Sequence, residues 1–481
     1  MNGKFCLRQE EFMSHNFLGE LESREHYWVK LRKSKRDDRI RLKRNKNFIP
    51  LQAMPAELVS EVYLLRNIPE IEVNFTDICK LLPVTSHLDT LLIYLNNSFI
   101  LHPQFANKLK QLEMTSTLLS ILNYNSPTST LSNACLLLCN YIALTDSSDE
   151  LLSSNIVPIL ISLINPCSLY LIENIIWCFT NIACEGLDQA QVLINENLIE
   201  ILYKLNIDLK PVLSNSLIKT FGLFFSQISK YSELLNEVTV KQISKLASEM
   251  IKGFKSLKIR CYFVALINLA KIESFIDILI ELNIPDLVLT FIDIPKYTFQ
   301  VIRFIQHIVS GNNSHTFYMI KKPIFNIFEM YIDSENLQMV YVILFSLSNI
   351  ISVTESLETL QKTQILQKSF LHLASSSEKV QIEASFLIKL VLNKASESQK
   401  RGLINFDFLE LIISAFDTKI PDLTKYLLYI SYVILNFLLI ELKDAYKEHA
   451  IQLANIISKL VQSQNSEISE LADGILSSFN F

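Results

Sequence analysis

Glycine is scarce in this sequence. Only eight glycines occur among 481 residues, and the two nearest in sequence, Gly3 and Gly19, are 16 residues apart. Phosphate-binding loops and dinucleotide-binding turns both need clustered glycines, because the backbone must approach the phosphate closely. The sequence also lacks the GxSxG motif of hydrolases. Enzymes built on these motifs are therefore excluded.

Paired cysteines and clustered histidines are also missing. The eight cysteines are scattered, no CxxC pair occurs, and only Cys135 and Cys139 have helical spacing. The eight histidines are dispersed as well, and no HExxH motif is present. Isolated cysteines of this kind indicate buried free thiols. We therefore expect no metal site, no cofactor and no enzymatic activity.

No apolar run is long enough to cross a bilayer. A spanning helix needs about 18 to 20 apolar residues, whereas the longest run, residues 426–440, has 15 and includes Ser431 and Asn436. This run is better explained as a buried helix. The first residues, MNGKFCLRQEEF, are too charged for the apolar core of a signal peptide. We expect an intracellular protein without membrane insertion.

A repeated helical pattern fills most of the chain. From about residue 107, apolar residues recur at helical spacing and short polar breaks separate the segments, which predicts an all-α fold. The segment IIWCFTNIACEG (175–186) contains Asn181, and the same pattern recurs about every 42 residues. The equivalent positions are Asn140, Phe225, Asn268, His307, Asn349 and Leu390, with a weaker copy at 422–440.

The breaks repeat too. Polar turns around Asn155, Asn197 and Asn283 each precede a further helical segment. About three helices in about 42 residues is the period of armadillo and HEAT repeats. We expect a right-handed superhelical solenoid whose concave groove is lined by the third helix of each repeat. The expected domains are a basic arm (1–50), capping helices (51–106) and armadillo repeats (107–481).

Evenly spaced asparagines suit an extended peptide as ligand. A side-chain amide both donates and accepts hydrogen bonds, so it can pair with a peptide backbone. Trp177 lies one helical turn before Asn181 and could hold the stem of a Lys or Arg side chain. Glu185 is placed to receive its charge. Alternatively, the four asparagines form an internal ladder that bonds neighbouring loops, with Trp177 as an ordinary core residue.

The residues around Trp177 resemble a known family. NIIWCFTNIACEG is similar to the third-helix motif of importin-α armadillo repeats, and the resemblance spans roughly residues 24–440. In that family an arginine replaces the tryptophan of the sixth repeat, and Arg303 stands at this position; Glu383 stands where the family has an acidic cargo contact. The cargo-binding residues that the resemblance implies are Asn140, Glu173, Trp177, Asn181, Glu185, Asn268, Arg303, Asn349 and Glu383.

The sequence departs from the family at the tryptophan position. Only Trp177 keeps that residue, which implies shallower lysine pockets and altered cargo rules. The other aligned residues are Leu136, Phe221, Val264, Phe345 and Phe386.

A basic segment precedes the repeats. Residues 24–46 contain eleven Lys or Arg and three Asp or Glu, a net charge of +8, whereas residues 47–481 carry −11. The order Leu31-Arg32-Lys33, Lys35-Arg36 and Asp37-Asp38, with Lys43-Arg44 following, resembles the importin-β-binding segment of importin-α. The carrier-binding residues that this implies are Leu31, Arg32, Lys33, Lys35, Arg36, Lys43 and Arg44.

Three functions remain open at this stage. The resemblance implies a nuclear import adaptor that binds basic localisation signals and is carried by importin-β. Such an adaptor shuttles between cytoplasm and nucleus, with an export receptor as a further partner. The alternative is an armadillo scaffold that no longer reads such signals. A nucleic-acid-binding solenoid is disfavoured, because residues 47–481 are acidic.

Overall fold

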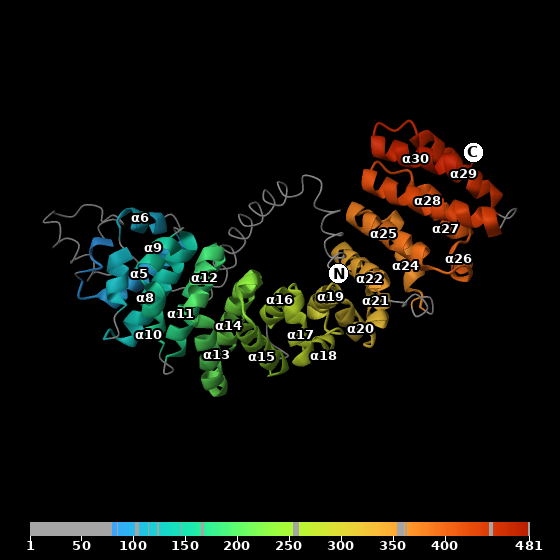
Figure 1. Cartoon of the computed structure of the whole chain (residues 1–481). Coiled ribbons are helices and arrows are strands. Elements are labelled where there is room, and N and C mark those ends of the chain that lie inside the picture. Colours follow the sequence, from blue (N-terminus) through green and yellow to red (C-terminus); the bar gives the residue numbers. More distant parts are fainter. Residues whose placement is uncertain are drawn as a thin grey trace. The chain divides into compact units, whose positions relative to one another are not determined.

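The computed structural model describes most of the chain after the N-terminal region. The described residues are 79–479, without residues 84, 102–104, 114, 123–124, 146, 165–167, 254–258, 354–359, 361–362 and 442–445. Every regular element in this part of the chain is helical (Figure 1), which confirms the predicted all-α class. Two compact units, Met1–Asn268 and Leu269–Phe481, share the chain. Each is described by itself below.

Among its described residues, the first unit contains α5 (Leu88–Leu101) followed by four successive groups of helices. These groups are α6 (Phe105–Gln111), α7 (Thr115–Ile121) and α8 (Thr128–Leu144); α9 (Ser148–Ser153), α10 (Ile156–Ser162) and α11 (Leu169–Glu185); α12 (Leu187–Asn195), α13 (Leu198–Leu209), η2 (Lys210–Val212) and α14 (Asn215–Ile228); and η3 (Ser229–Leu234), α15 (Glu237–Gly253) and α16 (Arg260–Leu269).

The second unit continues the same pattern. Its groups are α17 (Glu273–Glu281), α18 (Ile284–Leu289) and α19 (Pro295–Val309); α20 (Asn313–Ile320), α21 (Ile324–Tyr331) and α22 (Leu337–Val353); α24 (Ile365–Leu371), η4 (His372–Ala374) and α25 (Glu378–Lys394); α26 (Glu397–Leu403), α27 (Phe406–Ala415) and α28 (Pro421–Glu441); and the pair α29 (Lys447–Leu460) and α30 (Ser466–Phe479).

The last helix of each group, called the third helix here, builds the stack. In the first unit α5 packs on α8, α8 on α11 and α11 on α14, and in the second unit α19, α22, α25 and α28 pack in the same order. Three helices per repeat, joined through successive third helices, make this an armadillo-repeat solenoid. Helix α5, which lies in the region 51–106 expected to cap the repeats, packs on α8 at the start of this stack.

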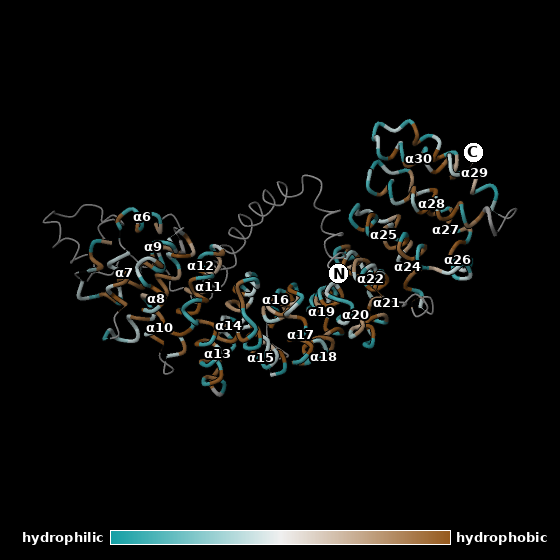
Figure 2. The backbone as a smooth tube through the Cα atoms, viewed as in Figure 1, coloured by the Kyte–Doolittle hydropathy of each residue, from teal (hydrophilic) through white to brown (hydrophobic). Residues whose placement is uncertain are grey.

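Buried apolar residues of the third helices hold the stack together. On α11 the side chains of Ile172, Ile175, Ile176 and Phe179 are fully buried. Figure 2 shows apolar and polar residues interleaved along the helices of both units. Full burial of one such side chain stabilises the fold by roughly 1.5–3 kcal/mol. A single repeat cannot bury these apolar residues alone, and the neighbouring repeats supply the missing contacts.

The predicted asparagine turns are confirmed. Asn155, Asn197 and Asn283 have φ angles of 56°, 54° and 54°, each directly before the second helix of its repeat. Asparagine tolerates this left-handed conformation better than most residues with a side chain. Glu113, between α6 and α7, has φ 51° and therefore occupies the same kind of turn with a less suitable residue.

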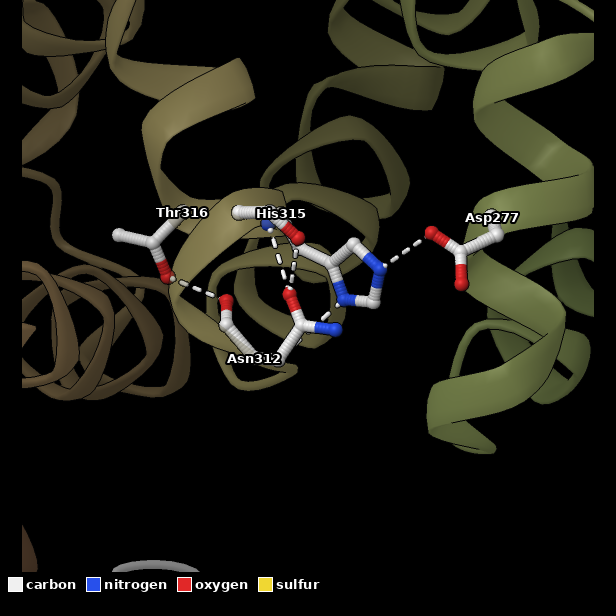
Figure 3. A network of polar contacts seen from close by, with 5 residues as sticks. Asp277, Asn312, His315 and Thr316 are labelled. Atoms are coloured by element: carbon white, nitrogen blue, oxygen red, sulfur yellow. Dashed lines mark hydrogen bonds and ion pairs between the residues drawn. The ribbon is translucent and has the colours of Figure 1, made fainter. Parts of the chain in front are cut away.

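A polar junction joins two repeats of the second unit (Figure 3). The Asn312 side chain accepts a hydrogen bond from the backbone N–H of His315 at 3.1 Å, and His315 Nδ1 accepts from the Asn312 N–H at 3.2 Å. Because Nδ1 accepts, the ring proton lies on Nε2, which donates to Asp277 Oδ1 at 2.8 Å. This network caps α20 and connects it to α17.

Candidate functional site

The third helices of the groups share two equivalent positions, one turn apart, of which the first is exposed or partly exposed in every pair given below. On α11 they are Trp177, which is partly exposed, and Asn181. In the first unit the pairs are Leu136 and Asn140, Trp177 and Asn181, Leu223 and Gln227, and Val264 and Asn268; in the second unit they are Arg303 and His307, Phe345 and Asn349, Phe386 and Leu390, and Tyr429 and Val433. We call the surface around these positions the third-helix face.

The register predicted for α14 is wrong. Phe221 and Phe225, which the alignment places at the tryptophan and asparagine positions, have exposed fractions of 0% and 1%. Leu223 and Gln227 are partly exposed instead. Two residues turn an α-helix by about 200°, so this small shift exchanges the buried side for the outer one.

The asparagines donate hydrogen bonds to the preceding repeat. Asn140 Nδ2 donates to Asn96 Oδ1 at 2.8 Å, and Asn181 Nδ2 donates to the Cys139 carbonyl at 2.9 Å. Asn268 Nδ2 lies 3.3 Å from the carbonyl oxygen of Ser226. The exposed fractions of Asn140, Asn181 and Asn268 are 1%, 4% and 6%.

The second unit contains a corresponding bond, from Asn349 Nδ2 to Ser310 Oγ at 2.8 Å. Asn349 itself is partly exposed. The alternative interpretation of the sequence, an internal ladder of asparagines, agrees with these contacts in part. The acceptors Asn96, Cys139 and Ser226 lie on helices rather than in loops, and Trp177 is partly exposed rather than an ordinary core residue. Their amides fasten neighbouring third helices, since a buried amide is costly unless it finds a partner.

Trp177 stands between two acidic residues on one side of α11. Glu173, Trp177 and Glu185 are all partly exposed. The Glu173 carboxylate accepts hydrogen bonds from the hydroxyls of Ser216 and Thr220 on α14. Glu185 is the last residue of α11. Of the candidate residues, these three are brought together on an accessible part of the third-helix face.

Arg303 and His307 lie on α19. The Arg303 guanidinium carbon is 6.0 Å from the centre of the Phe299 ring. Burial lowers the pKa of His307 to about 3, and the positive charges of Lys271 and Arg303 act in the same direction. His307 Nε2 is buried without a hydrogen-bond partner. This imidazole is therefore neutral at physiological pH.

Glu383 does not lie where the resemblance places a cargo contact. Its exposed fraction is 3%, and its Oε1 accepts a hydrogen bond from Ser348 Oγ on α22 at 3.1 Å. The carboxylate is positioned between two third helices because a buried charge needs such a partner. A peptide on the third-helix face would not reach it without a rearrangement.

The third helices carry few acidic residues. The sequences of α8, α14, α16, α19 and α22 contain none. The partly or fully exposed Lys and Arg residues on third helices are Lys219, Arg260, Lys296, Arg303, Lys379, Lys389, Lys394 and Lys425. Apart from Asp89, Glu378 and Asp422 in the first turns of α5, α25 and α28, the partly or fully exposed acidic side chains described on these helices are Glu173 and Glu185, on either side of Trp177. The acidic excess of residues 47–481 lies elsewhere.

Some candidate residues fall outside the described part of the chain. These are the carrier-binding residues Leu31, Arg32, Lys33, Lys35, Arg36, Lys43 and Arg44. Within the described residues, no group of three or more His, Cys, Asp or Glu side chains could hold a metal ion, and no helix is long and apolar enough to span a membrane.

Sequence reasoning missed the tyrosines of α28. The run 426–440 was interpreted as a buried helix, but the exposed fractions of Tyr429 and Tyr432 are 39% and 37%. A signal was present, because Tyr426, Tyr429 and Tyr432 recur every three residues and can therefore share one side of a helix.

Comparisons with known proteins support the fold. No protein-family model and no curated protein matches the sequence. Among solved structures, the crystal structure of an engineered protein covers 85% of this chain and 100% of its own, with a TM-score of 0.71 and 14% identity. A chain from a structure of a phosphorylation switch controlling the interaction between cadherin and β-catenin has a TM-score of 0.65 and 13% identity, and the match covers 85% and 86% of the two chains.

A designed armadillo-repeat protein in complex with the peptide (KR)4 is also similar. This match covers 48% of the present chain and 99% of the designed one, with a TM-score of 0.42 and 18% identity. Similarity at these identities concerns the fold alone.

Proposed function

We propose that this protein is an armadillo-repeat scaffold that binds an extended segment of a partner protein on its third-helix face. The observation that carries the proposal is the exposure of large apolar side chains at the tryptophan positions within each unit. Trp177 and Leu223 in the first unit, and Phe345 and Phe386 in the second, are partly exposed one repeat apart. Regular exposure of such residues is typical of a surface that a partner covers.

The dimensions of the repeats suit an extended chain. Packed helices lie about 8–10 Å apart, and an extended peptide advances about 3.3 Å per residue. Successive third helices are therefore about three peptide residues apart. A bound segment could place one side chain over each repeat.

The test is a screen of a displayed peptide library on the purified full chain, followed by affinity measurements. Peptides that bind the proposed surface should lose about tenfold or more in affinity on Trp177→Ala or Phe345→Ala substitution, equivalent to about 1.4 kcal/mol. Phe317→Ala is the matched control, because Phe317 is 45% exposed but lies on the first helix of its repeat, α20. Selected peptides that are insensitive to both third-helix variants would refute the proposal.

A second candidate is a nuclear import adaptor. Its support is the basic segment 24–46 with its importin-β-binding pattern, together with the Glu173, Trp177 and Glu185 cluster on α11. In this proposal the cluster binds a basic localisation signal, aided by Asn181, while the arm binds an importin-β carrier. The protein would shuttle between cytoplasm and nucleus and would need an export receptor to return.

The remaining family positions have smaller parts in this candidate. Arg303 and Asn349 would mark a second and weaker cargo site. Asn140 and Asn268 would contribute only if their amides leave the preceding repeat, since both are buried.

Titration with a fluorescent basic localisation peptide distinguishes the two candidates. An adaptor should bind this peptide and lose most binding on Trp177→Ala substitution. Deleting residues 1–50 should abolish binding to importin-β and strengthen peptide binding, because the basic cluster at Lys43 and Arg44 no longer competes for the acidic site. The gain should shrink as salt increases. A protein that binds neither the basic peptide nor importin-β is not an adaptor, and the scaffold proposal would still stand.

A further inference from the structure

The surface of α25 and α28 differs from the rest of the third-helix face. Lys389 on α25 reaches across to α28, where its Nζ lies 5.4 Å from the centre of the Tyr426 ring and 4.8 Å from that of Tyr429. Phe386 packs edge-on against Tyr426, with ring centres 5.6 Å apart. The Tyr429 hydroxyl donates to Asn393 Oδ1 at 3.0 Å. We call Phe386, Lys389, Asn393, Tyr426 and Tyr429 the lysine–tyrosine cluster.

The charge of Lys389 is not neutralised by a carboxylate. Within the described residues, no Asp or Glu oxygen forms an ion pair with its Nζ, whereas the neighbouring Lys425 pairs with Glu467 at 2.5 Å. Glu383, on the same helix, is buried and bonded to Ser348. The aromatic rings hold the ammonium group through their negative faces. They leave its charge available to an anion on the open side.

The adjacent helix offers an uncharged aromatic surface. Tyr341 and Phe345 of α22 are partly exposed, with ring centres 6.2 Å apart. No residue of α22 carries a charge at neutral pH. An apolar side chain would therefore be favoured next to α22, and an acidic side chain one repeat further, at Lys389.

We propose that this part of the third-helix face binds an acidic peptide segment of a partner protein, with a carboxylate of that segment paired to Lys389. The inference rests on the scaffold function proposed above and assigns the chemistry of its ligand in the second unit. With about three extended residues between neighbouring third helices, the preferred segment has an apolar residue and an acidic residue three positions apart.

The other charged ligands fit this surface less well. A basic segment would be repelled by Lys389. A nucleic acid could stack on the tyrosines, but its affinity depends on many phosphate contacts with cations. Here the lysines of α25 and α28 are few, and exposed acidic residues stand at the start of both helices, Glu378 and Asp422. A peptide with one or two carboxylates matches this pattern.

The test uses the full chain and three labelled twelve-residue peptides in a fluorescence anisotropy titration. The first alternates Leu and Glu at a spacing of three in a Ser/Gly background; the second has Gln for each Glu, and the third has Lys. The Glu peptide should bind about tenfold tighter than the Gln peptide, because a charge-assisted hydrogen bond is about twice as strong as a neutral one. The Lys peptide should bind weakest.

Variants localise the effect. Lys389→Met keeps much of the apolar stem and should bring the affinity of the Glu peptide down to that of the Gln peptide, while Lys389→Arg should retain the preference. Lys379→Met is the matched control, because Lys379 is an exposed lysine on the same helix that lies ten residues before Lys389, about 15 Å away along the helix axis. It should leave the preference unchanged.

The outcomes separate this inference from the scaffold proposal. If the peptides bind with equal affinities and Lys389→Met has no effect, the inference is wrong although the surface binds peptides. If a (dT)12 oligonucleotide binds tighter than the Glu peptide and requires Lys389, the ligand is a nucleic acid and the inference is again wrong. If neither these peptides nor any selected from the library bind, the scaffold proposal fails as well.

Discussion

His307 should make the folded state sensitive to mild acid. This imidazole occupies the asparagine position of α19, and burial together with Lys271 and Arg303 lowers its pKa from 6.5 to about 3. As the pH falls below 6.5, the unfolded chain takes up a proton that the folded chain does not. The contribution of neutral His307 to the free energy of unfolding is therefore fully present above pH 6.5 and is lost progressively as the pH falls toward 3.

The size of this pH effect follows from the difference between the pKa values of His307 in the unfolded and folded states. Each pKa unit corresponds to about 1.4 kcal/mol. Because the pKa of His307 in the folded state lies far below pH 5.5, linkage lowers the free energy of unfolding by about 1.4 kcal/mol between pH 7.5 and 5.5. His307 keeps some solvent contact, so this value is an upper limit.

Urea unfolding followed by circular dichroism at the two pH values measures the loss. The His307→Asn variant removes the titrating group and restores the residue type found at this position in other repeats. Its stability should change less between pH 7.5 and 5.5 than that of the wild type, by up to about 1.4 kcal/mol. The pKa of His372 is also lowered by burial, but this residue is present in both proteins and its contribution cancels. An identical pH dependence in the two proteins would refute the reasoning.

Four further changes test the fold and the arm. Asn181→Ala should lower the free energy of unfolding by about 1 kcal/mol, because it removes a buried hydrogen bond to α8; no change in the urea midpoint would contradict the ladder. Glu113→Asn should raise the thermal midpoint slightly, since asparagine suits a positive φ. Gly222→Ala should destabilise by about 1–3 kcal/mol, because the added Cβ would lie 2.8 Å from Tyr262 Cε2; an unchanged midpoint would show that the ring moves easily. Deleting residues 1–50 should leave the thermal midpoint unchanged, and a large decrease would show that this segment packs on the repeats.

The repeat period and the turns could be predicted because they depend on local sequence. Helical spacing of apolar residues is visible without any tertiary information. Asn155, Asn197 and Asn283 adopt the left-handed conformation that asparagine favours. These features depend on the type of a single residue, or on its pattern with neighbours a few positions away.

The register of α14 could not be predicted in this way. The segment KTFGLFFSQI has bulky apolar residues on several sides, among them Phe221, Leu223, Phe224 and Phe225. Spacing alone favours an aromatic residue at both aligned positions. The structure places Leu223 outside because the buried phenylalanines fill the space against neighbouring helices. Such a choice depends on the shapes of several repeats at once.

The charge of the third-helix face could not be predicted from the sequence, for a different reason. Net charge is a sum over all residues, and it does not show which side of each helix carries the charge. The acidic balance of residues 47–481 suggested an acidic groove. The third helices instead combine few acidic residues with Lys219, Arg260 and Lys389. Only the assignment of each residue to a side of its helix could reveal this.

The hydrogen bonds of the asparagine ladder limit how these amides could bind a partner. One Nδ2 hydrogen of Asn181 is used by the Cys139 carbonyl, and Asn181 is almost fully buried. To bind a peptide backbone, this amide would have to leave its partner and expose the Cys139 carbonyl, which opposes the gain from the new bond. Backbone capture by the asparagines is therefore weak here. In the binding modes proposed above, exposed side chains rather than the asparagines provide most of the affinity. Partners should then be selected by residue type: basic next to Trp177 and acidic next to Lys389.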